Sequence, residues 1–201
     1  MAVMKIVFAS GNEGKVKEIS SMLSETGIEL VSLNNYKDVP EIVEDGLSFQ
    51  ENALKKARII CEFTGETTLA DDSGLMVDAL NGEPGIYSSR YAGDKATDRE
   101  NNAKLLAKLK NIPAEKRTAA FHCSLILYRK DGTYESFEGR WRGQIIEEER
   151  GANGFGYDPL FWVPELKKTA AELPPEIKNK VSHRGQAVAK LKDWLLKKAA
   201  R

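Results

Sequence analysis

The chain has 201 residues, of which 41% are apolar and 30% are charged, so it can bury a sizeable core. Its 30 lysine and arginine residues balance its 30 aspartate and glutamate residues. A formal net charge of zero argues against a protein that binds nucleic acid duplexes, because such proteins normally carry a basic excess. It does not exclude a small anionic ligand held by a few local cations.

The two cysteines and the N-terminal residues bear on the compartment. Cys61 and Cys123 are far apart, in a pattern typical neither of a disulfide framework nor of a metal site, which favours a reducing compartment. Met1–Ala9 lacks a signal-cleavage pattern, and no apolar run approaches the length of a membrane span. We expect a cytoplasmic protein with no membrane partner and a single domain over residues 1–201.

The first half of the chain alternates strands with helices. A continuous apolar run at residues 4–9 is typical of a buried strand, and apolar residues at helical spacing follow it after a polar loop. In chain order we predict a strand at 4–9, a loop at 10–15, a helix ended by Gly27, a strand at 30–33, a polar loop at 34–47, a helix with a Ser48–Glu51 capping box and Gly65 at its end, and a strand that ends at Asp71 and Asp72.

The second half contains a predicted hairpin. Thr97 and Glu100 form another capping box, for a helix whose core face includes Ala103, Leu106 and Leu109. In chain order we predict an irregular segment at 81–94, that helix, a strand at 119–128, a turn at 130–133, strands at 134–141 and 144–146, a glycine-rich loop at 151–159, a strand at 160–163 and a last helix from near Arg184. We therefore expect an α/β fold with a mixed central sheet, flanking helices, and two lobes with the active-site cleft between them.

Asp71 and Asp72 are adjacent acids at the end of a predicted strand. Their repulsion and burial raise the free energy of both carboxylates, and Mg²⁺, which prefers oxygen ligands, would remove that cost. A solvated turn is the alternative from this stretch alone, because Asp-Ser-Gly is good turn chemistry. Strand alternation points the two side chains to opposite sides, so only one can face a ligand directly. Glu41, Glu44 and Asp45 are possible further metal ligands, although each alone is more simply a solvated loop acid.

The segment from Ser10 to Lys15 joins the first strand to the first helix. Its two glycines let backbone N–H groups approach an anion, the helix N-terminus adds positive potential, and the lysine adds a full charge. A plain strand-to-helix turn is the alternative, and the spacing differs from that of a Walker A loop. The candidate phosphate-binding residues are Ser10, Gly11, Asn12, Glu13, Gly14 and Lys15.

The glycine-rich loop at 151–159 carries aromatic residues between glycines. Phe155 and Tyr157 on such a backbone suit stacking on a flat ring such as a nucleobase, and Asp158 can accept from a ring N–H. The alternative is a loop whose aromatic side chains fold back into the core.

Several donors gather just before the last predicted helix: Lys178, Lys180, Ser182, His183 and Arg184. Arginine at a helix start opposes the helix dipole, and a residue placed against local preference suggests a ligand. A lone histidine here would more simply be structural.

Taken together, these segments resemble the inosine triphosphate pyrophosphatase family. The resemblance runs from about residue 5 to residue 196 and rests on five motifs in the right order. They are Ser10-Gly11-Asn12 with Lys15, Ala70-Asp71-Asp72-Ser73-Gly74-Leu75, Pro84-Gly85-Ile86-Tyr87-Ser88-Ser89-Arg90-Tyr91, Gly154-Phe155-Gly156-Tyr157-Asp158-Pro159 and Ser182-His183-Arg184-Gly185. The resemblance implies Mg²⁺-dependent hydrolysis of dITP, ITP and XTP or dXTP to the monophosphate and pyrophosphate, by a homodimer that cleans the nucleotide pool.

The resemblance also implies roles for individual residues. Asp72 is the catalytic acid and a metal ligand, together with Glu41 or Glu44. Ser73 lies beside the substrate, and Ser10–Lys15 bind phosphate. Phe155 stacks on the base, and Gly156, Tyr157 and Asp158 continue that motif. Lys178 contacts the substrate, and His183 and Arg184 donate to the keto oxygen at C6.

These roles give a mechanism with open points. Mg²⁺ withdraws charge from the triphosphate, and Asp72, or a water that it shares with the metal, activates the attacking water. Attack at the α-phosphorus and at the β-phosphorus are both compatible with the motifs. Adenine presents an amine where inosine presents a keto oxygen, so buried donors would face donors. The exclusion of guanine needs another device, which the sequence does not identify.

Two other functions fit parts of the pattern. One is a housekeeping pyrophosphatase for modified pyrimidine triphosphates. The other is a non-catalytic nucleotide-binding protein, which would keep the stacking loop and the donors but would not need paired acids.

Overall fold

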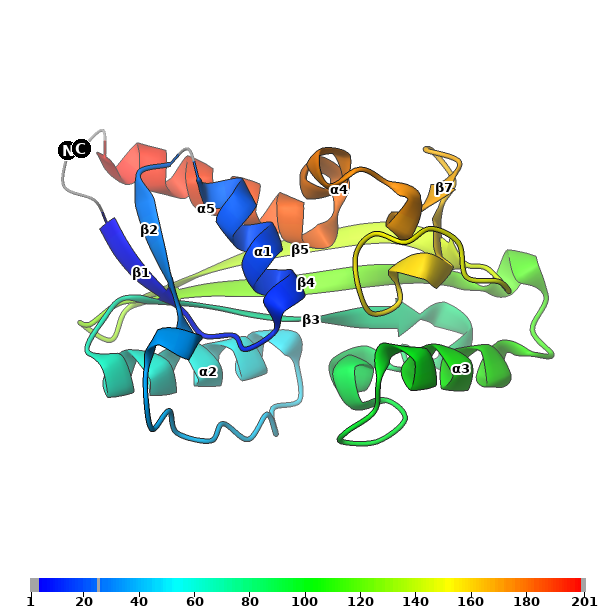
Figure 1. Cartoon of the computed structure of the whole chain (residues 1–201), viewed down its shortest axis with the longest axis horizontal. Coiled ribbons are helices and arrows are strands. Elements are labelled where there is room, and N and C mark those ends of the chain that lie inside the picture. The colour runs from blue at the N-terminus through cyan, green and yellow to red at the C-terminus, as the bar shows by residue number, and fades with distance from the viewer. Residues whose placement is uncertain (1–3, 25, 200–201) are drawn as a thin grey trace. The chain divides into compact units, whose positions relative to one another are not determined.

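The computed structural model describes residues 4–24 and 26–199 and contains strands and helices in alternation (Figure 1). The strands are β1 (Met4–Phe8), β2 (Ile28–Ser32), β3 (Thr68–Val77), β4 (Thr118–Tyr128), β5 (Tyr134–Ile145), β6 (Phe161–Val163) and β7 (Lys168–Thr169). The α-helices are α1 (Glu13–Leu23), α2 (Phe49–Thr64), α3 (Asp98–Leu109), α4 (Pro175–Val181) and α5 (His183–Ala199). Short 3-10 helices are η1 (Leu33–Asn35), η2 (Asp78–Leu80), η3 (Gly85–Arg90), η4 (Ala114–Lys116), η5 (Asp158–Leu160) and η6 (Ala170–Glu172).

The strands form one mixed sheet with the order β2-β1-β3-β4-β5-β6-β7. β1 runs parallel to β2, with Ile6 opposite Leu30, and parallel to β3. β6 runs antiparallel to β5, with Phe161 opposite Ile145, and antiparallel to β7. The prediction of an α/β fold with a mixed sheet is therefore confirmed.

The chain divides into two compact units. The first takes its described residues from the stretches up to Asp72, from Cys123 to Gly139, and from Arg184 onward. The second comprises Ser73–His122 and Arg140–His183. β3 passes from the first unit to the second between Asp72 and Ser73, directly after the two acids.

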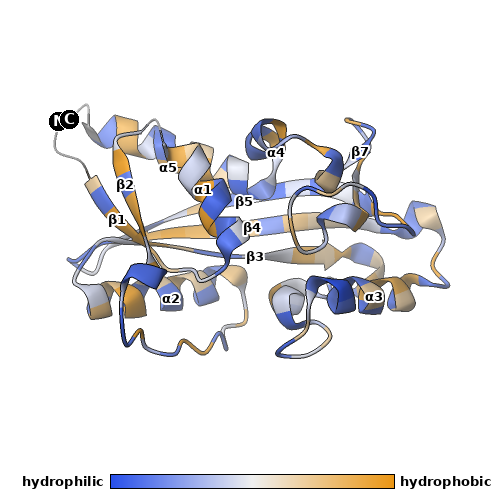
Figure 2. Cartoon of the chain, viewed as in Figure 1, coloured by the Kyte–Doolittle hydropathy of each residue, from blue (hydrophilic) through white to orange (hydrophobic). Residues whose placement is uncertain are grey.

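The first unit buries apolar residues on both faces of β1, because side chains alternate along a strand. Ile6 and Phe8 belong to one cluster, which includes apolar residues of α1 and α5. Val7 belongs to another, which includes Ala53, Ala57 and Ile60 of α2. The two clusters place α1 and α5 on one face of β1 and α2 on the other, and Figure 2 shows both hydrophobic and hydrophilic residues on α2, as an amphipathic helix requires.

The second unit has its own core. Leu75 of β3 and Leu105 of α3 are fully buried in it. Phe121 and Phe161 add a ring contact with centroids 4.5 Å apart. This core supports the glycine-rich loop, because Tyr157 is one of its members.

Capping residues in the sequence correctly predicted the ends of α2 and the start of α3. Ser48 caps α2, and Gly65 ends it in the left-handed conformation at φ 66°. The Thr97–Glu100 capping box of α3 is present in full. At α2 the Glu51 carboxylate accepts from the Leu47 N–H at 2.8 Å, so the reciprocal half of that predicted box is shifted by one residue.

Other boundaries were predicted wrongly. α1 begins at Glu13 and ends at Leu23, so part of the predicted loop at 10–15 is helical and Gly27 lies beyond the helix. β3 does not end at the acids but continues to Val77. The predicted strands at 134–141 and 144–146 are one strand, β5. α4 was not predicted, and Ala103 is exposed, because Leu105 and Leu109 form the buried face of α3.

None of the helices in residues 4–24 and 26–199 is both long enough and apolar enough to cross a bilayer. Cys61 and Cys123 are buried free thiols, which agrees with the expected lack of a disulfide framework. Burial raises the pKa of the Cys123 thiol to about 12.

Candidate active site

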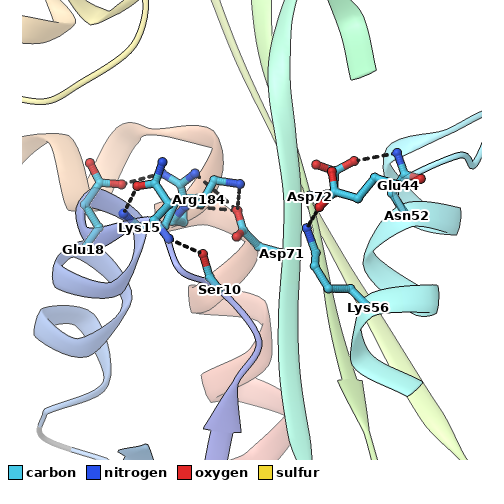
Figure 3. Close-up of polar contacts among 10 residues, drawn as sticks. Ser10, Lys15, Glu18, Glu44, Asn52, Lys56, Asp71, Asp72 and Arg184 are labelled. Atoms are coloured by element: carbon cyan, nitrogen blue, oxygen red, sulfur yellow. Dashed lines mark hydrogen bonds and ion pairs between the residues drawn. The ribbon is translucent and has the colours of Figure 1, made fainter. Parts of the chain in front are cut away.

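The site in the first unit is built around the two acids of β3. Asp71 is fully buried and Asp72 is 5% exposed. Figure 3 shows their carboxylates on opposite sides of the strand, with separate partners. The prediction from strand alternation is therefore confirmed, and each acid has its own environment.

Asp71 pairs with two cations. Its Oδ2 lies 3.1 Å from Lys15 Nζ of α1 and 3.3 Å from Arg184 Nη2 of α5. Burial by itself raises the pKa of this carboxyl, but the charges of Lys15 and Arg184 outweigh it and hold the pKa well below its ordinary value. Asp71 is therefore an ionised structural anchor for both cations.

Arg184 is 1% exposed and is bound by two carboxylates from different elements. Its Nε and Nη2 donate to Asp71 at 3.4 and 3.3 Å, and its Nη1 donates to Glu18 Oε2 of α1 at 2.5 Å. Burial disfavours the charged guanidinium, but the two carboxylates outweigh that cost and raise the pKa of Arg184. Its unfavourable position at a helix start is thus compensated locally.

The start of α1 has the geometry of an anion site. Ser10 Oγ accepts from the Asn12 N–H at 3.2 Å, and Asn12, the N-cap, accepts from the Lys15 N–H at 3.0 Å. Glu13 and Gly14 are the first residues of this 11-residue helix, where backbone N–H groups lack intrahelical acceptors. The positive end of the helix dipole therefore coincides with Lys15, as the phosphate-loop hypothesis requires.

On the other side of β3, Asp72 faces α2. Asn52 Nδ2 donates to Asp72 Oδ2 at 3.1 Å, and Lys56 Nζ lies 2.5 Å from Glu44 Oε1 (Figure 3). Burial raises the pKa of Asp72 to about 6, with a further increase from Glu44 that Lys56 and Lys15 only partly offset. Burial lowers the pKa of Lys56, but Glu44 and Asp72 outweigh it and raise the pKa above its ordinary value.

Asn52 also holds the loop that carries Glu44. Its Oδ1 accepts from the Gly46 N–H at 2.8 Å, so one fully buried amide connects this loop to Asp72. A Cβ at Gly46 would lie 2.7 Å from that oxygen, which explains why glycine stands there.

The residues around Asp72 fit a magnesium ion. Mg²⁺ is usually bound by one or two carboxylates together with waters and substrate phosphates, and the raised pKa of Asp72 is a cost that a cation would remove. Glu44 is half-buried and contributes to that raised pKa, whereas Glu41 is exposed and is not among its main causes. Within the described residues no group of three or more acids, histidines or cysteines is arranged to hold a metal ion by itself, and Glu44 is the loop acid whose charge acts on Asp72, so we take Asp72 and Glu44 as the candidate pair.

The glycine-rich loop of the second unit is braced from inside. Asp158 Oδ2 accepts from the Phe155 N–H at 2.9 Å and pairs with Lys178 Nζ at 2.5 Å. Lys178 Nζ also lies 5.1 Å from the centroid of the Phe155 ring. Asp158 and Lys178 are both nearly fully buried, so this pair fixes the loop around the aromatic side chain.

Close approach explains one glycine of the loop. Gly154 has φ 77°, and a Cβ there would lie 2.1 Å from the Asp158 carboxylate. Tyr157 donates its hydroxyl to the Ser88 carbonyl at 2.8 Å and is 4% exposed. Phe155 is only half-buried, so the aromatic residues of the loop divide between the core and a more open position.

His183, in the first turn of α5, is 4% exposed and stacks on Phe121, with ring centroids 4.8 Å apart and an interplanar angle of 12°. The stacking fixes the plane of the imidazole and therefore the directions in which its nitrogen atoms point.

Comparison with known proteins identifies the family. A profile described as the Ham1 family matches residues 6–194. The dITP/XTP pyrophosphatase of Geobacter sulfurreducens is 52% identical over 191 residues, which cover 95% of this chain and 96% of that protein. The chain belongs to the Ham1 family.

Solved Ham1 structures have the same fold. The HAM1 protein of Coxiella burnetii matches with a TM-score of 0.88 and 44% identity over 96% of this chain and 99% of that chain. The nucleoside-triphosphatase, or dITP/XTP pyrophosphatase, of Mycobacterium abscessus matches with a TM-score of 0.75 and 48% identity over 94% and 97% of the two chains. The family assignment made from the five motifs is thereby confirmed.

The structure groups the predicted site residues of this Ham1 chain into two sets. The first unit contains Ser10–Lys15, Glu41, Glu44, Asp72 and Arg184, and the second contains Ser73, Phe155, Gly156, Tyr157, Asp158, Lys178 and His183. Within the first set, Lys15 and Arg184 meet at Asp71. Within the second, Phe155, Asp158 and Lys178 are in mutual contact.

Three residues of the candidate site were missed from the sequence. Asn52 and Lys56 lie four residues apart on α2, among the buried positions Ala53 and Ala57. A polar side chain at a buried helical position was the available signal. Glu18 of α1 pairs with Arg184 of α5, and no local spacing in the sequence indicates that pair.

Proposed function

We propose that this chain hydrolyses dITP, ITP and XTP or dXTP to the nucleoside monophosphate and pyrophosphate, and so removes them from the nucleotide pool. Curated relatives about 50% identical over nearly the whole chain are named dITP/XTP pyrophosphatase. The observation that carries the proposal is the buried Asp72 carboxylate, whose pKa is about 6 and which lies beside Asn52. A protein that only binds nucleotides has no need of such a group.

Asp72 is the proposed general base. In the metal-free protein the pKa of Asp72 is about 6, so the carboxyl is mostly ionised at neutral pH and able to accept a proton, and a bound Mg²⁺ would lower that pKa. It accepts a proton from the attacking water, while Asn52 orients its carboxylate and Lys56 provides a positive charge near it.

Asp72 and Glu44 are the proposed ligands of Mg²⁺. When bound, the ion neutralises triphosphate charge and polarises the reacting phosphorus. Ser10–Lys15 bind phosphate oxygens through the N-terminus of α1 and through Lys15, which Asp71 holds in place. Lys178 is proposed as a further substrate contact, because its ammonium lies above the Phe155 ring.

The glycine-rich loop and the start of α5 provide the proposed contacts to the base. Phe155 stacks on the purine, with Gly156, Tyr157 and Asp158 shaping the loop around it. His183 and Arg184 donate to the keto oxygen at C6, and adenine is rejected because its amine would leave these donors unpaired. Ser73 is proposed to lie beside the substrate.

A triphosphate panel tests the function. ITP, dITP, XTP, ATP, GTP and modified pyrimidine triphosphates are each incubated with the chain, with and without Mg²⁺, and pyrophosphate release is measured. We expect release from the first three at a kcat/KM far above that for ATP, GTP and the pyrimidine triphosphates, and release only with Mg²⁺. Release from the pyrimidine triphosphates alone, or ITP binding without any release, would refute the proposal.

The site of attack is decided by labelled water. Attack at the α-phosphorus, which we propose, places the labelled oxygen in the monophosphate, and attack at the β-phosphorus places it in pyrophosphate. Mass spectrometry of the two products separates these outcomes.

We also propose that the chain is a homodimer in the cytoplasm. Tyr87, in the segment 81–91, is 56% exposed, with the Arg90 guanidinium 5.2 Å from its ring centroid, so an exposed aromatic surface is available for a second copy. Sedimentation velocity of wild type and Tyr87→Glu tests this, and a monomeric wild type would refute it.

A further inference from the structure

The peptide groups on both sides of Gly156 are held by two side chains near the start of α3. The Gly156 N–H donates to Asp98 Oδ2 at 2.6 Å, and the Gly156 carbonyl accepts from Asn102 Nδ2 at 3.2 Å. Asp98 and Asn102 are four residues apart and therefore share one face of the helix. All of these residues belong to the second unit.

The orientation of the Asn102 amide is fixed by its neighbours. Asn102 is 3% exposed, and its Nδ2 also donates to Glu149 Oε1 at 3.0 Å. Because both neighbours are acceptors, only the amide nitrogen can face them. Asparagine is therefore required here as a double donor, and an isosteric carboxylate would face two acceptors.

These two bonds act on the backbone next to Phe155. Gly156 has φ 63° and lacks a side chain that would restrict it. The Gly156 N–H belongs to the peptide plane that joins it to Phe155, so the bond to Asp98 fixes the direction in which the aromatic ring leaves the backbone. The bond from Asn102 fixes the next peptide plane.

The loop has other attachments that keep it folded. Tyr157 is anchored on the Ser88 carbonyl, and Asp158 is paired with Lys178. Loss of the α3 contacts should therefore loosen the orientation of Phe155 without releasing the loop from the core.

We propose that Asp98 and Asn102 are positioning residues, which hold Phe155 in the orientation that stacks on a nucleobase. This inference rests on the proposed function. Because stacking tolerates any base, loss of either contact weakens binding of ITP and ATP by the same factor. The preference between these substrates stays unchanged, which distinguishes positioning from base reading.

The test compares Asp98→Ala, Asp98→Asn and Asn102→Asp with Arg99→Ala as the matched control. Arg99 is the exposed neighbour of Asp98 on the same helix turn. Hydrogen–deuterium exchange of the segment 151–160 reports on the loop without catalysis, and KM and kcat for ITP and ATP report on function.

For Asp98→Ala we expect faster exchange in 151–160, a KM for both substrates about 5- to 10-fold higher, and kcat within about twofold of wild type. Asp98→Asn keeps an acceptor oxygen and restores KM, and Arg99→Ala resembles wild type. Asn102→Asp should raise KM more than Asp98→Ala does. If Asn102→Asp fails to fold, the variants at the exposed Asp98 still test whether α3 positions Phe155.

Unchanged exchange in Asp98→Ala, or an unchanged KM in an active enzyme, would overturn the inference. A changed ratio of ITP to ATP preference would also overturn it, because it would assign base reading to this turn. If wild type fails to hydrolyse ITP, the proposed function fails separately, and the exchange data still show whether α3 holds the loop.

Discussion

Asp72→Asn should stabilise the metal-free protein at neutral pH. The pKa of Asp72 is raised in the fold from its ordinary 3.8 to about 6, mainly by burial. The folded state therefore binds this proton more tightly than the unfolded state. The ionised carboxylate lowers the free energy of unfolding above a pH of about 6, and this cost disappears as the pH falls below about 4.

The magnitude follows from the two pKa values. Each tenfold change in proton affinity corresponds to about 1.4 kcal/mol, so the shift from 3.8 to about 6 amounts to about 3 kcal/mol at neutral pH. Asparagine keeps an acceptor oxygen for Asn52, so the removed cost should exceed the lost contacts. We expect a gain of about 1–3 kcal/mol near pH 7.5, or roughly 2–4 °C in Tm for each kcal/mol.

Urea unfolding followed by circular dichroism, in a chelating buffer between about pH 4 and pH 8, measures the difference. Asp71→Asn is the matched control with the opposite sign. The pKa of Asp71 is depressed by Lys15 and Arg184, so its ionised form stabilises the fold above the unfolded pKa, and loss of that charge destabilises the fold.

Added Mg²⁺ should stabilise wild type but not Asp72→Asn, which should also lose turnover. A destabilised Asp72→Asn in chelator at about pH 7.5, or retained turnover, would refute the reasoning.

Three further predictions test other parts of the site. Glu44→Gln should raise the Mg²⁺ concentration needed for half-maximal activity at least about tenfold, whereas Glu41→Gln should not, and equal effects in a Mg²⁺ titration would contradict the choice of ligand. Arg184→Ala should reduce the ratio of kcat/KM for ITP over ATP, and an unchanged ratio would remove its base-reading role. Gly154→Ala should lose about 1–3 kcal/mol of stability in urea unfolding, because its Cβ would lie 2.1 Å from a carboxylate oxygen, whereas Gly156→Ala, with no atom within 4 Å of its Cβ, should lose less.

Much of the fold and of the candidate site was predictable because local chemistry decided it. The apolar run at 4–9 specified a buried strand, Thr97 and Glu100 specified a helix start, and alternation specified that Asp71 and Asp72 point to opposite sides. The five motifs also specified the Ham1 family, because each retains its residue types in order along the chain.

Which side chains form ion pairs with which acid depended on the tertiary structure. The assignment of Lys15 and Arg184 to Asp71 joins α1, α5 and β3, and no local pattern states which acid receives which cation. The roles of Asn52 and Lys56 were not predicted. Helix periodicity indicates which positions of α2 are buried, but it does not indicate that polar side chains at these positions interact with an acid on a strand.

The sequence by itself therefore determined the strand that carries the two acids, their alternation and the family. Only the packing of helices against that strand decided their chemistry. Asp71, placed between two cations, has a depressed pKa, and Asp72, buried beside Asn52, has a pKa of about 6. Adjacent, chemically identical residues differ because desolvation and Coulomb interactions depend on three-dimensional neighbours rather than on position in the chain.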